Sequence, residues 1–330
     1  MTIKKRSLLN LISTNQKNGF GKSHAKIILI GEHSVVYGQP AIALPLSAVK
    51  TQVRITANGT NEQTIDCRYF SGSLTNLPPS MKGLQHLIAY ILTKVIQPVA
   101  GFKITIRSQL PEERGMGSSA ATAVATIRAL FDFFKLPLSH QQLLHLANIE
   151  EVDTHGNPSG LDAATAASST PIWMIRNKEL LPIPIHLNAC LLICDSGVKG
   201  KTSAAVAEVK ERLNLQPVST TQVLNNLGKL TVLARKQLIQ NDAIALGKTF
   251  NQAQADLKSL GVSSPRLDSL IAQSLKLGSL GSKLTGGGRG GCFICLMPNR
   301  VSAERAAIKL KKAGVTATWI QPLSVEEELG

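Results

Sequence analysis

A short loop of small residues is the part of the sequence best suited to chemistry. It precedes an alanine-rich helical pattern over residues 120–134 and consists of Arg114, Gly115, Met116, Gly117, Ser118 and Ser119. The first turn of a helix leaves about four N–H groups unpaired and carries roughly half a positive charge, while glycines let a ligand approach the backbone closely. These residues therefore predict a phosphate site, although an ordinary N-cap before a buried helix would have a similar sequence.

Other residues can supply the remaining groups that phosphoryl transfer requires, namely a divalent cation and an acceptor for the proton of the attacking hydroxyl. Mg²⁺ prefers oxygen ligands and takes only one or two from the protein, so the Ser118 hydroxyl and one carboxylate would suffice. Asp162 follows a turn containing glycine and proline and begins a helix, where it can act as a general base or simply complement the helix dipole. A second glycine-rich stretch, residues 285–291, can approach the loop from another domain.

Three competing motifs fail on their spacing. Two segments imitate a Walker A loop, but the positions that need its first glycine hold Gln16 and Asp195. Residues 286–291 satisfy a dinucleotide-binding glycine pattern, yet they lead into a strand-like run and no acidic residue follows at the expected distance. Cys292 and Cys295 lie in that same run, where alternation places their thiols on opposite faces. We therefore expect neither a P-loop, a Rossmann site nor a cysteine metal site.

Composition narrows the class of protein. The 330 residues carry a formal net charge of +15, with 4% aromatic residues. No apolar run reaches the roughly 18–20 residues of a membrane span, and residues 1–21 lack the cleavage pattern of a signal peptide. The five cysteines favour a reducing cytoplasm. Because the lysines are dispersed and aromatic residues are few, we expect a small-molecule partner and not nucleic acid. From the cysteines and the lack of a long apolar run, we expect a cytoplasmic protein that does not bind membrane.

The predicted elements form two domains after an N-terminal extension. The extension spans residues 1–21, the first domain residues 22–180 and the second residues 181–330. In the first domain we expect helices at 81–96, from 118, at 139–152 and 159–167, and strands at 26–30, 41–46, 52–56, 101–107 and 172–175. In the second we expect helices at 203–213, 221–240, 242–259 and 265–275, and strands at 191–195, 283–284, 292–297 and 315–320. Interleaving without a strict βαβ repeat predicts an α+β fold with two layers per domain.

Four segments in this order resemble the motifs of the GHMP kinases, the superfamily that includes galactokinase, homoserine kinase, mevalonate kinase and phosphomevalonate kinase. They are residues 26–38 (KIILIGEHSVVYG), 110–121 (LPEERGMGSSAA), 155–162 (HGNPSGLD) and 283–292 (KLTGGGRGGC). The first and third of these segments are similar to the mevalonate kinase forms of the motifs. The resemblance implies an N-terminal domain with a left-handed βαβ unit, a C-terminal ferredoxin-like domain and an active site in the cleft between them.

The resemblance also implies a role for individual residues. Ser118 and Glu151 would hold Mg²⁺, Asp162 would be the catalytic base, and Lys26 would lie beside the substrate hydroxyl. ATP would be bound by residues 114–119 together with Gly286, Gly287 and Gly288. Contacts to substrate would come from Glu32, His33 and Thr202, although the same Thr202 is also consistent with a plain helix N-cap.

The implied reaction is ATP- and Mg²⁺-dependent phosphorylation of the primary hydroxyl of mevalonate, and a homodimer is compatible with the superfamily. Another kinase of the superfamily, such as phosphomevalonate kinase, is the nearest alternative, followed by a basic nucleic-acid-binding protein. The chain departs from the family pattern at His24 and Ala25, which replace Pro-Gly, and at Arg289, which would contact phosphate or point to solvent. We expect Glu112 and Glu113, next to the loop, to face water.

Overall fold

Two β-sheets organise the protein. The computed structural model describes residues 18–95, 101–110, 114–155, 158–200 and 202–323. One sheet has seven strands in the order β4-β3-β5-β2-β6-β7, with β1 also paired to β2, and the other has four strands in the order β11-β8-β10-β9. The first sheet ends at Pro182 and the second begins at Cys190, so the predicted boundary at residues 180/181 falls inside the last strand of the first sheet.

The first sheet is built around two long antiparallel strands, β1 (Asn18–Ile30) and β2 (Pro40–Ala57). The strands expected at 41–46 and 52–56 are thus one continuous strand. Residues 18–21 pair with β2 as well, which corrects the prediction that the extension reaches residue 21. The remaining strands are β3 (Gln63–Asp66), β4 (Ser71–Ser73), β5 (Phe102–Ser108), β6 (Ile172–Ile175) and β7 (Glu179–Pro182). β3 and β5 pair in parallel, and the left-handed crossover between them stays a prediction.

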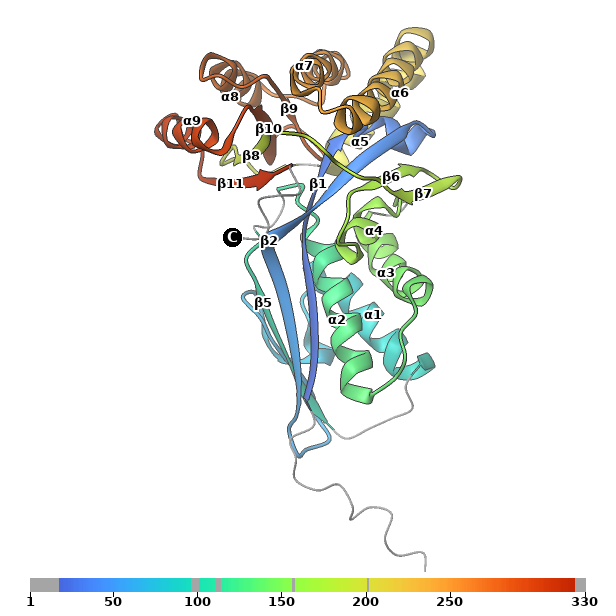
Figure 1. The fold of residues 1–330 in the computed structure, drawn as a ribbon. Coiled ribbons are helices and arrows are strands. Elements are labelled where there is room, and N and C mark those ends of the chain that lie inside the picture. Colours follow the sequence, from blue (N-terminus) through green and yellow to red (C-terminus); the bar gives the residue numbers. More distant parts are fainter. Residues whose placement is uncertain (1–17, 96–100, 111–113, 156–157, 201, 324–330) are drawn as a thin grey trace, which may run out of the picture.

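Helices cover one face of this sheet (Figure 1). They are α1 (Lys82–Tyr90), which continues as the π-helical turn η4 (Ile91–Val95), α2 (Ser118–Phe134), α3 (His140–His155) and α4 (Leu161–Ala167). Short 3-10 turns are η1 (Ser34–Tyr37), η2 (Leu74–Asn76) and η3 (Pro79–Met81). α2 packs so closely on β1 that a Cβ at Gly21 would lie 1.9 Å from the Ala125 carbonyl oxygen. A glycine is therefore needed there to bring the helix onto the strand.

The second sheet has the strand and helix succession of a ferredoxin-like domain. It comprises β8 (Cys190–Asp195), α5 (Thr202–Leu215), α6 (Pro217–Ile239), α7 (Ala243–Ser259), α8 (Pro265–Lys276), β9 (Gly281–Leu284), β10 (Cys292–Met297), α9 (Arg300–Lys312) and β11 (Ala317–Pro322). All its strand pairs are antiparallel. The α+β prediction is confirmed, whereas α9 and the strands β3, β4 and β7 were not expected. The side chain of Asn299 caps α9, and Ala303, Ala306 and Leu310 are buried on its inner face. The basic residues within 309–312 obscure this helical spacing of apolar residues in the sequence.

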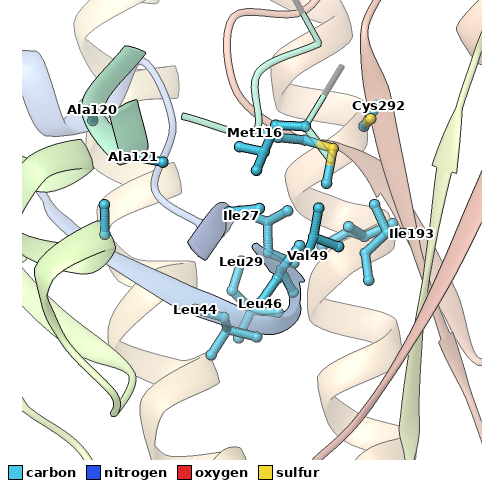
Figure 2. Packing of buried hydrophobic residues seen from close by; sticks show 14 of the residues in the cluster. Ile27, Leu29, Leu44, Leu46, Val49, Met116, Ala120, Ala121, Ile193 and Cys292 are labelled. Carbon is cyan, nitrogen blue, oxygen red and sulfur yellow. The ribbon is translucent and has the colours of Figure 1, made fainter. Parts of the chain in front are cut away.

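The two domains share one hydrophobic core. Buried side chains from β1 and β2, such as Ile27 and Leu46, belong to the same cluster as Ile193 of β8 and Cys292 of β10. Met116 lies among them, as Figure 2 shows, and its side chain is almost fully buried. The side chain of Met116 thus fastens the predicted phosphate loop to the core. None of the helices in the described residues is long and apolar enough to cross a membrane.

Candidate active site

Lys26 and Asp162 form an ion pair at the centre of the predicted site. Lys26 lies in β1 and Asp162 in the first turn of α4, and the Lys26 Nζ atom is 2.8 Å from Asp162 Oδ1. The lysine side chain is 3% exposed and the aspartate side chain 29% exposed. The carboxylate can therefore be reached from solvent, while its cationic partner is held inside the protein. The structure brings together the two residues predicted to act on the substrate hydroxyl.

The phosphate loop is in direct contact with this pair. Gly117 has φ +70°, and a Cβ added to it would lie 2.7 Å from the Cε atom of Lys26. The Lys26 backbone N–H donates to the Met116 carbonyl oxygen at 3.0 Å. Gly117 occupies the N-cap position of α2, and no side chain of the described residues caps this helix. The ordinary N-cap reading of Ser118 therefore does not hold, and Ser118 and Ser119 begin a helix N-terminus of the kind that attracts anions.

Glu151, on α3, contributes a second carboxylate beside Asp162. Its Oε1 atom accepts a hydrogen bond from the Ala163 backbone N–H at 2.8 Å, whereas Oε2 is buried without a hydrogen-bond partner among the described residues. Burial, followed by repulsion from Asp162, raises the pKa of Glu151 to about 8. A nearby cation would relieve both effects. The buried oxygen without a partner therefore fits the prediction that Glu151 binds a hard cation such as Mg²⁺.

The described residues contain no group of three His, Cys, Asp or Glu side chains that could hold a metal. Mg²⁺ commonly keeps several waters and uses substrate phosphate oxygens in addition to one or two protein ligands. A set of one carboxylate and the Ser118 hydroxyl is consistent with that chemistry.

Glu32 is bound by a residue that sequence reasoning missed. It lies two residues after the end of β1 and forms a fully buried ion pair with Lys283 of β9. Lys283 Nζ also donates to the Leu284 carbonyl oxygen at 2.7 Å. Burial raises the pKa of Glu32 and lowers the pKa of Lys283, and their mutual attraction opposes both shifts. The second carboxylate oxygen of Glu32 is buried without a hydrogen-bond partner among the described residues. A lysine in a predicted strand directly before the second glycine stretch was the signal that could have identified Lys283.

His33 has a strained backbone conformation. Its φ and ψ angles are 61° and −51°, and the Ser34 N–H donates to the Glu32 carbonyl oxygen at 2.7 Å, which closes a γ-turn of the rare type. The His33 Nε2 atom is hydrogen-bonded to the Gly287 carbonyl oxygen at 3.1 Å, so Nε2 carries the proton. Burial lowers the pKa of His33 to about 4. His33 is therefore a neutral side chain held between the domains, and such strain is concentrated at functional sites.

The two glycine stretches meet, as predicted. A Cβ at Gly286 would lie 3.0 Å from the Gly115 Cα atom, and one at Gly287 would lie 2.4 Å from the Thr202 hydroxyl oxygen. Thr202 begins α5 and is exposed. Gly288 instead contacts the connection between α7 and α8, where a Cβ would lie 2.1 Å from the Val262 carbonyl oxygen. Gly286 and Gly287 therefore lie between the phosphate loop and Thr202.

Both arginines near the glycine stretches bind protein groups. Arg289 is paired with Glu208 and donates to the Gly261 carbonyl oxygen. The expectation that it contacts phosphate or points to solvent was therefore wrong, because its side chain binds protein groups. Arg114 Nε donates to Asp195 Oδ2 at 2.9 Å. The prediction that Glu112 and Glu113 face water lies outside the described residues.

Comparisons with known proteins agree with this geometry. Residues 83–170 match the GHMP kinases N terminal domain and residues 234–316 match the GHMP kinases C terminal family. Mevalonate kinase of Pyrococcus abyssi is 31% identical over 92% of this chain and 96% of its own length. The crystal structure of L. major mevalonate kinase in complex with R-mevalonate has a TM-score of 0.79 at 26% identity and covers 94% of this chain and 97% of its own.

A more distant structure shares the fold alone. Streptococcus pneumoniae phosphomevalonate kinase has a TM-score of 0.77 at 18% identity and covers 92% of this chain and 99% of its own. The match to mevalonate kinases is closer in sequence and extends over almost the full length of both chains. The chain belongs to the mevalonate kinase family of the GHMP kinases.

Proposed function

We propose that the protein transfers the γ-phosphoryl group of ATP to the primary hydroxyl of mevalonate, giving 5-phosphomevalonate and ADP. ATP is the phosphate donor of GHMP kinases, and the curated relatives are mevalonate kinases. The observation that supports the proposal best is the Lys26–Asp162 pair, because it places a solvent-reachable carboxylate and a buried cation against a helix N-terminus that begins at a glycine N-cap. The phosphomevalonate kinase alternative is not favoured, since its representative shares the fold alone.

The proposed division of labour follows from what each group can do. The N–H groups at the start of α2 and the adjoining glycines bind the phosphates, where the helix dipole favours negative charge. Asp162 accepts the proton of the attacking hydroxyl, and the ammonium of Lys26 offsets the negative charge that the hydroxyl oxygen gains as its proton leaves. Because Lys26 is buried, water screens its charge less than it would at the surface.

We propose that Ser118 and Glu151 hold Mg²⁺. The bound ion would neutralise phosphate charge during transfer. The two protein groups contribute a hydroxyl oxygen and the buried carboxylate oxygen that has no hydrogen-bond partner among the described residues.

Substrate contacts are proposed for Glu32, His33 and Thr202. The second carboxylate oxygen of Glu32 is a buried acceptor for a substrate hydroxyl, and Lys283 holds its first oxygen. His33 donates from Nε2 to the Gly287 carbonyl oxygen, which leaves Nδ1 as an acceptor for a donor group of the substrate. Thr202 presents an exposed hydroxyl beside the same glycine. A homodimer and a cytoplasmic location stay predictions, the latter supported by five free cysteines.

The decisive experiment is ADP release measured with mevalonate, phosphomevalonate, galactose and homoserine as acceptors. We expect turnover with mevalonate. Replacement of Asp162 by Asn is expected to reduce kcat by about 10²-fold or more, since loss of a general base typically costs 10²- to 10⁴-fold, with ATP binding largely kept. Near-normal turnover by this variant, or preference for another acceptor, would contradict the proposal.

A further inference from the structure

We propose that Arg114 and Asp195 are a positioning pair that fixes the phosphate loop on the C-terminal domain. The inference rests on the proposed function only in assuming that residues 115–119 bind nucleotide phosphates. Arg114 is the first residue of the loop, directly before its glycines, and Asp195 ends β8. The pair acts on the nucleotide through the backbone of the loop, and neither side chain needs to touch the substrate.

The ion pair is specific in geometry and mostly buried. Arg114 Nε lies 2.9 Å from Asp195 Oδ2, and the two side chains are 16% and 6% exposed. Arg114 Nη1 is buried without a hydrogen-bond partner among the described residues, and within that part of the chain Asp195 is the group that holds this guanidinium. Charged hydrogen bonds that are shielded from water are stronger and more directional than pairs at the surface.

Three segments meet at this pair. The carbonyl oxygen of Arg114 accepts a hydrogen bond from the Cys292 N–H at 3.1 Å, directly after the second glycine stretch. The other oxygen of Asp195, Oδ1, accepts from the Gly197 N–H at 2.9 Å and so shapes the segment that leads to Thr202. The Ser196 N–H donates to the Gly291 carbonyl oxygen at 3.0 Å. The pair therefore joins the phosphate loop to both C-terminal segments of the site.

The loop needs an anchor at each end because of its own composition. Gly115 and Gly117 have φ angles of +75° and +70°, a conformation that glycine adopts freely but gives no rigidity of its own. After Gly115, the loop is held by the buried Met116 side chain and by the hydrogen bond from the Lys26 N–H. Before Gly115, the charged anchor is Arg114. Without it, this end of the loop keeps the backbone hydrogen bond from Cys292 but loses the charged one, so more of the loop must be ordered when nucleotide binds, which weakens binding.

The test separates positioning from simple stabilisation. Arg114→Met, Asp195→Asn and the double variant Arg114→Met/Asp195→Leu are compared with Arg300→Met, which removes an exposed pair on α9. Steady-state kinetics give KM for ATP, KM for mevalonate and kcat, calorimetry gives the Kd of ADP, and a thermal scan gives Tm. We expect about a 10-fold rise in KM for ATP and in the Kd of ADP for all three variants, with KM for mevalonate within about 2-fold of wild type.

Recovery in the double variant distinguishes the two roles. Replacement of both charges by apolar groups is expected to recover Tm but not nucleotide affinity, because the apolar pair lacks the directional bond. Arg114→Lys keeps the charge and one donor and is expected to recover part of the affinity. If a Met or Asn variant does not fold, Arg114→Lys and Asp195→Glu provide the same comparison with charge conserved.

Unchanged ADP affinity in folded variants would overturn the inference, and so would affinity that returns together with Tm in the double variant. The proposed function fails separately, if wild type releases no ADP in response to mevalonate. The Kd of ADP would still test the positioning pair in that case.

Discussion

The buried pair of Glu32 and Lys283 allows a sharp prediction for Lys283→Met. The two side chains are 1% and 0% exposed, and they connect β9 of the C-terminal sheet to the turn that follows β1. Removal of the ammonium leaves a carboxylate inside the protein with no cation, and one of its oxygens already has no hydrogen-bond partner among the described residues. Loss of one partner of a buried pair costs about 3–5 kcal/mol, a large fraction of the roughly 5–15 kcal/mol that stabilises a typical domain.

The assay is urea unfolding of wild type, Lys283→Met and the double variant Glu32→Leu/Lys283→Met. Lys258→Met is the matched control, because Lys258 is 65% exposed and forms a surface pair with Asp268 worth at most about 1 kcal/mol. The double variant should recover most of the lost free energy of unfolding, since no unpaired charge is left in the interior.

The pH dependence of Lys283→Met gives a second check on the same reasoning. Burial raises the pKa of Glu32 in the folded state, and loss of Lys283 removes the attraction that opposes the rise. The folded state then binds more protons than the unfolded state, so stability falls as pH rises above the unfolded pKa of 4.5. The loss in free energy of unfolding of Lys283→Met relative to wild type should therefore be smaller at pH 5 than at pH 8. A deficit equal to that of Lys258→Met, or a double variant as unstable as the single one, would refute the reasoning.

Two further predictions concern the loop and His33. Gly117→Ala adds a Cβ 2.7 Å from Lys26 Cε and should lower kcat at least about 10-fold. The control Gly59→Ala imposes a similar backbone strain in open space and should leave kcat unchanged. Equal kcat values for the two variants would refute the steric argument. Because the pKa of His33 is about 4 in the folded state against 6.5 unfolded, wild type should lose up to about 3 kcal/mol of stability as pH falls from 6.5 to 4. His33→Asn should flatten that part of the urea-derived stability profile, and an unchanged profile would show that His33 is not the titrating group.

The sequence was sufficient where the signal is local. The four motifs were recognised from short runs of neighbouring residues. The same holds for the helix that starts at Ser118 and the strand that starts at Cys292, and the structure confirms both elements. Local patterns also fix Asp162 in the first turn of a helix. The ends of elements were predicted less well. The burial pattern of β2 changes from continuous to alternating along its length, so its two halves were predicted as separate strands. The lysines of α9 interrupt its apolar pattern, so this helix was not predicted.

Tertiary structure alone decided the partners of the charged groups. Lys283 and Glu32 are 251 residues apart, and Arg114 and Asp195 are 81 apart, so no periodicity or spacing relates them. Met116 shows the same limit, because a loop residue predicted at the nucleotide site is a core side chain once β8 and β10 pack against it. Residue types and their order determined by themselves which chemistry the chain can perform. Which charge neutralises which, and what holds the glycine loop in place, depends on packing between two sheets that the sequence keeps far apart.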